Sequence, residues 1–110
     1  MDIEAPWRPY DEGRTIGARG SERGVIVADE EHEAGTRITL EKRRAFPGSK
    51  QPPFAITCGV YGGMMHTRFF RDEAGALEGY AAMKPRLLAL AVSNDRDWER
   101  NAGKFLTDFP

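Results

Sequence analysis

Residues 54–70, FAITCGVYGGMMHTRFF, decide the fold that we expect for this chain. Two β-prone apolar runs flank Gly62-Gly63, and a glycine pair in this position is a strong signal for a two-residue hairpin turn. Such a turn would place Cys58 opposite Thr67. Because side chains alternate along a strand, the hairpin then has two faces, one of them apolar. The predicted core face holds Phe54, Ile56, Cys58, Val60, Met65, Thr67 and Phe69.

The other face of this predicted hairpin mixes polar and apolar side chains. On it, Gly59 would lie opposite His66 and leave a notch beside the imidazole. A small anion could bind in that notch, with Arg68 donating a two-pronged hydrogen bond. The pattern gives five candidate ligand-binding residues, His66, Arg68, Tyr61, Thr57 and Gly59.

Cys58, the only cysteine in the chain, and His66 form the obvious pair of nucleophile and base. The predicted register puts them on opposite faces of the sheet, whereas nucleophilic attack needs the base within about 3 Å. We therefore expect Cys58 to be a buried, inert thiol, and we predict no catalytic residue. The sequence leaves open whether the protein is an enzyme.

A second hairpin is predicted upstream, from strands at residues 25–32 and 36–44. Residues 33–35, EAG, fit a three-residue loop with glycine in the left-handed position. This register gives one apolar face, and that supports it. The residues on that face are Ile26, Ala28, Ile38 and Leu40.

Three further segments around these strands are predicted to be less regular. Residues 14–20 can form a short edge strand, and residues 45–53 form a proline-rich loop. Residues 1–13 are expected to be an irregular N-terminal arm, because Pro6 and Pro9 exclude a helix there.

The apolar period becomes helical after Asp72, which is a candidate helix N-cap. The predicted buried stripe of this helix is Ala76, Tyr80, Met83, Leu87 and Leu90. Pro85 should kink or split the helix, and residues 94–110 form a second, helical tail. Strands followed by helices predict an α+β fold. We expect an antiparallel meander of four to five strands, with the C-terminal helices packed on one face, in a single domain of residues 1–110.

Charge and composition limit the partners. The chain has 110 residues, with 16 basic and 17 acidic side chains and a net charge of −1, so bulk charge does not indicate nucleic acid. The one basic cluster, Lys42, Arg43 and Arg44, is divided between two faces by strand alternation, which makes nucleic-acid binding the weakest of the functions considered. The acidic stretch at residues 29–33 is divided in the same way, and with two histidines in the chain we expect no metal and no cofactor.

The same data favour a cytoplasmic protein of bacterial type. A single cysteine excludes an intramolecular disulfide, residues 1–13 lack a secretion signal, and the apolar stretch at residues 87–92 is too short to span a membrane.

The function that we expect is a non-catalytic binding or interaction module that self-associates, as a homodimer or with a protein partner. Apolar residues on a face that should contact water suggest such a partner. The predicted interface residues are Met64, Phe70, Trp98 and Phe105. The alternative is a protein or enzyme that binds a small, anionic ligand on the face of His66, Arg68 and Tyr61.

Overall fold

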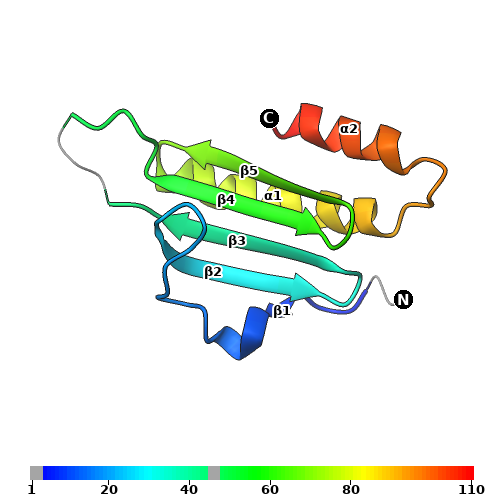
Figure 1. Ribbon diagram of the computed structural model, residues 1–110, viewed down its shortest axis with the longest axis horizontal. Coiled ribbons are helices and arrows are strands. Elements are labelled where there is room, and N and C mark those ends of the chain that lie inside the picture. Colours follow the sequence, from blue (N-terminus) through cyan, green and yellow to red (C-terminus); the bar gives the residue numbers. More distant parts are fainter. Residues whose placement is uncertain (1–3, 45–47) are drawn as a thin grey trace.

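The computed structural model describes residues 4–44 and 48–110 (Figure 1). Its sheet has five antiparallel strands in the order β1-β2-β3-β4-β5, and two helices follow the sheet in the chain. The predicted α+β meander is therefore confirmed. The strands are β1 (Arg8–Pro9), β2 (Val25–His32), β3 (Thr36–Lys42), β4 (Phe54–Val60) and β5 (Met64–Phe70). The helices are α1 (Glu73–Ala91) and α2 (Trp98–Asp108), and a 3-10 turn, η1, spans Tyr10–Gly13.

The edge strand next to β2 is not the segment that we predicted. It is β1, inside the predicted N-terminal arm, where Trp7 packs against the core. Residues 14–20 form a loop instead, and this loop is tied to β2 by hydrogen bonds from the N–H of Gly17 to the Ile26 carbonyl and from the N–H of Ile26 to the Ala18 carbonyl. Of the predicted arm and the proline-rich loop, residues 1–3 and 45–47 lie outside the described residues.

The hairpin of β2 and β3 confirms the predicted three-residue loop, with Gly35 at a φ of 94°. Further along, a β-bulge shifts the register between Ile26 and Ala28. Ala28 pairs with Leu40 on the core side, whereas Ile26 pairs with Glu41 and turns to the opposite face. The prediction that Ile26 shares a face with Ala28 is wrong, because the bulge adds one residue to the alternation.

The hairpin of β4 and β5 differs from the prediction by one residue. Its loop has three residues, 61–63, so that Val60 pairs with Met64. Within this loop Gly62 has a positive φ of 76° and Gly63 does not. Gly63 is instead required by space, since a Cβ there would lie 2.5 Å from Cζ2 of Trp98. Every side chain of β5 is therefore on the face opposite to the one predicted.

The hydrophobic core lies between the sheet and the helices. Helix α1 packs across β3, β4 and β5, and α2 packs against α1 (Figure 1). The predicted stripe of α1 is confirmed, because its five residues are the buried residues of that helix. Asp72 caps α1 by accepting a hydrogen bond from the N–H of Gly75 at 2.7 Å, and α1 continues as one helix through the exposed Pro85. No helix in the described residues is long and apolar enough to cross a membrane.

Candidate functional site

The face of the sheet turned away from α1, which we call the bare face, contains a trough of about 790 Å³. Its floor includes the small residues Thr39, Thr57 and Gly59 of the two central strands. The loop at residues 15–21 lines one side of the trough, and the β4–β5 turn lines the other. The trough exists because small side chains on the central strands lie between larger groups on both sides.

Large apolar side chains stand exposed on the bare face and at its rim. Met65 is 80% exposed, Tyr61 is 61% exposed and Phe69 is 46% exposed. Met65 pairs with Gly59 across the two strands, so a long side chain lies directly beside an empty position. The bare face therefore offers a ridge and a hollow next to each other.

A buried ion pair joins β2 and β3 beneath the bare face. Arg37 donates to both carboxylate oxygens of Asp29, at 2.9 and 2.7 Å, and the hydroxyls of Thr15 and Thr39 donate to the same carboxylate. Burial raises the pKa of Asp29, but these hydrogen bonds outweigh burial and hold the pKa below its usual value of 3.8. The ring of Tyr10 stacks on Arg37 at 3.5 Å. This cluster neutralises the charge of Arg37 and ties the loop at Thr15 to the sheet.

A second buried carboxylate, that of Glu41, holds the next part of the loop. It accepts hydrogen bonds from the backbone N–H groups of Glu22, at 3.1 Å, and Gly24, at 3.0 Å. Gly20 lies so close that an added Cβ would be 2.3 Å from the carboxyl carbon. The glycine-rich loop is therefore fixed as a wall of the trough, a role for Glu41 that the sequence analysis missed.

The five predicted ligand-binding residues divide between the two faces of the sheet. Thr57, Gly59 and Tyr61 line the trough, whereas His66 and Arg68 lie on the side of the helices. The predicted notch of Gly59 beside His66 is therefore absent, because Gly59 lies opposite Met65.

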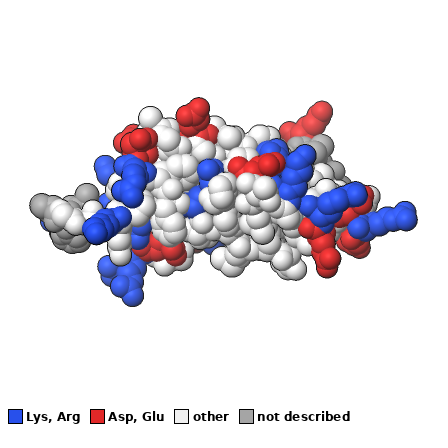
Figure 2. All heavy atoms as spheres, turned by 90° about the horizontal axis from the view of Figure 1, so that it is seen from above, with Lys and Arg blue, Asp and Glu red and all other residues white. Residues whose placement is uncertain are grey.

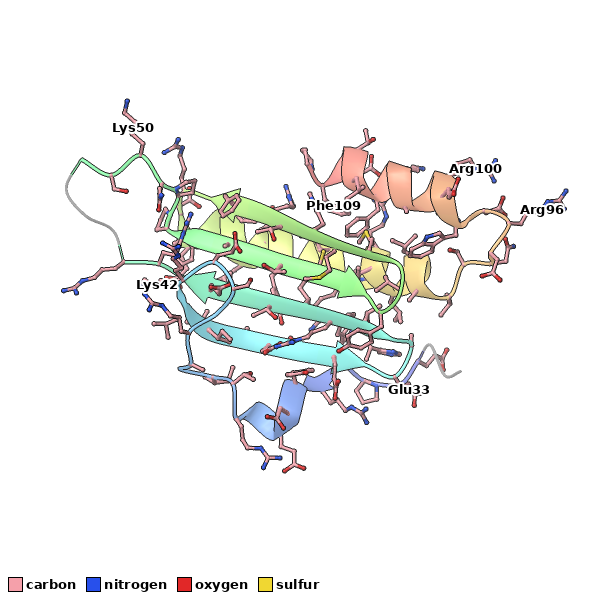
Figure 3. All side chains as sticks on the ribbon, in the orientation of Figure 1. Glu33, Lys42, Lys50, Arg96, Arg100 and Phe109 are labelled. Carbon is pink, nitrogen blue, oxygen red and sulfur yellow. The ribbon has the colours of Figure 1, made fainter. Side chains whose placement is uncertain are left out.

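His66 and Arg68 instead hold the residues that follow α2. His66 Nε2 is hydrogen-bonded to the carbonyl of Phe109, and Arg68 Nε donates to the Pro110 oxygen at 3.3 Å. The Arg68 guanidinium also lies 5.3 Å from the centre of the Phe109 ring, which points from the end of α2 toward β5 (Figure 3). These two side chains are occupied by contacts within the chain.

Cys58 and His66 pair directly across β4 and β5, which corrects the prediction that they lie on opposite faces. The expectation of a buried thiol is nevertheless correct, since Cys58 is 2% exposed. Burial raises the pKa of Cys58 to about 12. At neutral pH the thiol is therefore protonated, and this pair supplies no thiolate for nucleophilic attack.

The four predicted interface residues pack inside the protein. Phe105 is 1% exposed, and Met64, Phe70 and Trp98 are partly buried against the core. The register of β5 turns Met64 and Phe70 toward the helices, and Trp98 and Phe105 belong to α2, which packs against α1. The exposed apolar surface is built from other residues, Met65 and Phe69 among them.

The acidic stretch at residues 29–33 is also divided by strand alternation. Glu30 accepts hydrogen bonds from Tyr80 and Lys84, and His32 bonds to backbone groups of Ala5 and Ala34. Across the described ranges, no group of three or more histidine, cysteine or acidic side chains is placed to hold a metal ion.

Comparisons with family models, with curated proteins and with solved structures found no match to this chain.

Proposed function

We propose that the protein is a non-catalytic binding module that self-associates through the bare face of its sheet. The observation that carries this proposal is the exposure of Met65, at 80%, beside a trough on a face that α1 does not cover. A sheet with one covered face and one apolar, uncovered face favours a second layer. A second copy of the chain can supply that layer.

The shape of the bare face, with protruding side chains next to a trough, suits a symmetric contact. In a two-fold dimer the same patch meets itself, so a protruding group on one copy must find a hollow on the other. Met65 and Tyr61 protrude at the turn end of the sheet, and the floor at Thr57 and Gly59 is recessed beside them. A two-fold axis that passes between Met65 and the floor of the trough would place the methionine of each copy in the trough of its partner.

The chemistry of the chain also favours binding over catalysis. The nucleophile with the best geometry, Cys58, is protonated and buried, and His66 is bonded to a backbone carbonyl. Asp29 and Arg37 neutralise each other. These groups stabilise the fold and leave the trough mostly apolar.

The experiment compares Met65→Asp with Leu77→Asp by light scattering after gel filtration. Leu77 is 51% exposed on α1, so its replacement adds the same charge at a comparable apolar position away from the bare face. We expect wild type and Leu77→Asp to have the mass of a dimer and Met65→Asp that of a monomer, because each aspartate would be desolvated in the mostly apolar trough of its partner. Far-UV circular dichroism should be unchanged. A monomeric wild-type protein at high concentration would refute self-association.

A second candidate is a binding site for a small, mostly apolar ligand in the trough. Its volume of about 790 Å³ is in the range of small-molecule sites, which span roughly 300–1,000 Å³. The test is a fluorescence titration, with anilinonaphthalene sulfonate, of wild-type protein diluted until it is monomeric. Saturable binding that is lost when Thr57→Phe fills the trough would favour a ligand site. Absence of binding to the monomer would leave self-association as the function of this face.

A further inference from the structure

Basic side chains from four segments of the chain gather at the end of the sheet where β2 begins and β3 ends. We call this cluster the basic end. Figure 3 shows Lys42 and Lys50 there, and the space-filling view in Figure 2 shows basic side chains at the same, left end of the molecule. Its members are Arg19, Arg23, Lys42, Arg43, Arg44, Lys50 and Arg71.

The cations of the basic end are not neutralised by acidic side chains of the described residues. Within the described residues none of them forms an ion pair. In the part of the chain that the structure describes, the cations that form ion pairs lie outside the basic end: Arg8, Arg14, Arg37, Lys84, Arg86 and Arg100.

The carboxylates close to the basic end offset only part of its charge. Glu41 is buried and hydrogen-bonded to backbone N–H groups, and Asp72 caps α1. Glu22 and Glu73 are the other acidic residues of these segments. Seven cations against four carboxylates leave an excess of positive charge, which attracts an anion from solution.

The framework under these cations is well fixed. Arg43 donates two hydrogen bonds to the Pro52 carbonyl, at 3.1 and 2.6 Å, which holds the loop before β4 against the end of β3. The opposite loop is held by Glu41, as described above. Strand alternation separates Lys42 from Arg43. Folding brings four more cations to the same end of the sheet, Arg19, Arg23, Lys50 and Arg71. These residues are far apart in the sequence, so the sequence alone does not reveal the cluster.

An exposed aromatic ring lies beside the fixed arginine. Phe69 is 46% exposed on the bare face, and the guanidinium carbon of Arg43 is 5.0 Å from the centre of its ring. The guanidinium lies over the ring, and an exposed ring with a cation over one face is suited to stacking with a flat, electron-rich group.

We infer that the basic end binds single-stranded nucleic acid, with phosphates on the cations and one base stacked on Phe69. Arginine side chains match phosphate oxygens in geometry, and a flexible strand supplies both charges and flat rings at short intervals. An anionic membrane or an acidic protein supplies the charge without the bases. This inference does not depend on self-association, because Met65 and Tyr61 lie at the other end of the sheet.

The first measurement is fluorescence anisotropy of labelled oligothymidylate and oligouridylate at several salt concentrations. We expect binding that weakens as salt rises, because phosphate contacts release counterions. The double variant Lys42→Glu/Arg44→Glu should lose about tenfold or more in affinity. Its affinity should also depend less steeply on salt concentration, which means a smaller salt slope, because fewer phosphates are contacted. The control Arg96→Glu/Lys104→Glu changes net charge equally, at two exposed residues in and before α2, and should lose less than about twofold.

The second measurement isolates the base contact. Phe69→Ala should weaken binding by about tenfold and leave the salt slope unchanged, because stacking is not an ionic contact. The same variants are titrated with polyglutamate and with vesicles of phosphatidylserine and phosphatidylcholine. The inference is overturned if wild type fails to bind the oligonucleotides at low salt. It is overturned, too, if the control double variant loses as much affinity as Lys42→Glu/Arg44→Glu. It is also overturned if polyglutamate or vesicles bind as tightly and Phe69→Ala has no effect. Circular dichroism must show that each variant is folded.

Discussion

The two faces of the sheet are made by the same strands but differ in what covers them. On the helix side Ile38 and Ile56 have no exposed surface, whereas on the bare face Met65 is 80% exposed. Both faces carry large apolar side chains, so apolar character does not by itself identify the core. The distinction comes from α1, which packs across β3, β4 and β5 on one side.

The largest difference between the two faces should appear when the same residue is truncated on each. Met83 on α1 has no exposed surface, and Met65 is its counterpart on the bare face. Met83→Ala should lower the free energy of unfolding by roughly 2–5 kcal/mol, because it leaves a cavity in the core. Met65→Ala should change it by less than about 0.5 kcal/mol. Urea unfolding at a concentration that keeps the chain monomeric provides the measurement, and equal losses would mean that the bare face is packed in the monomer.

The next effect concerns a largely buried part of the bare face, the Asp29–Arg37 pair. Asp29→Asn should destabilise the protein by about 2–3 kcal/mol at neutral pH, less than for a fully buried pair because one-third of the Arg37 side chain is exposed. Thr15→Val, which removes one hydrogen bond to the same carboxylate, should cost only about 1 kcal/mol.

The same pair gives a pH dependence whose sign follows from the lowered pKa of Asp29. Stability from this group is fully present above the pKa of the unfolded chain, about 3.9, and is lost as the pH falls through the lower pKa of the folded state. The unfolding free energy of wild type should therefore decline more steeply below about pH 4 than that of Asp29→Asn. Parallel curves for the two proteins would show that the carboxylate is not held as described.

A smaller effect than that of Asp29→Asn is expected for Cys58, on the covered face. Because its thiol is buried and its pKa is raised to about 12, iodoacetamide should label it only as fast as the protein unfolds. Cys58→Ser should cost about 1–2 kcal/mol, because it buries a hydroxyl group. Rapid labelling of the native protein, followed by mass spectrometry, would instead reveal an opening between α1 and β4.

Local chemistry was sufficient to predict much of the fold. The loop at residues 33–35, the cap at Asp72 and the stripe of α1 each depend on neighbouring residues, and each is confirmed. The β4–β5 register depends on a distant contact. Gly62-Gly63 permits loops of two or three residues, and the structure has the longer loop, in which Trp98 of α2 packs against Gly63.

The candidate site was predictable only in part, for the same reason. Thr57, Gly59 and Tyr61 are correctly grouped because alternation along one strand places them together. The loop wall could not be foreseen, since Glu41 bonds to residues 17 and 19 positions earlier in the chain. The sequence signal for this contact was a glycine-rich segment, residues 17–24, upstream of Glu41, an acidic residue within a predicted strand.

The position of α2 also affects how the protein avoids aggregation. Strand β5 is the last strand of the sheet, and its outer backbone groups could pair with a strand from another chain. In Figure 1, α2 lies beyond β5, held through the bonds of His66 and Arg68 to the residues after it. At the opposite edge, β1 spans only two residues, Arg8–Pro9, and a proline donates no backbone hydrogen bond. One edge is thus flanked over part of its length by a helix and the other is cut short, so the sheet is poorly suited to grow along its edges.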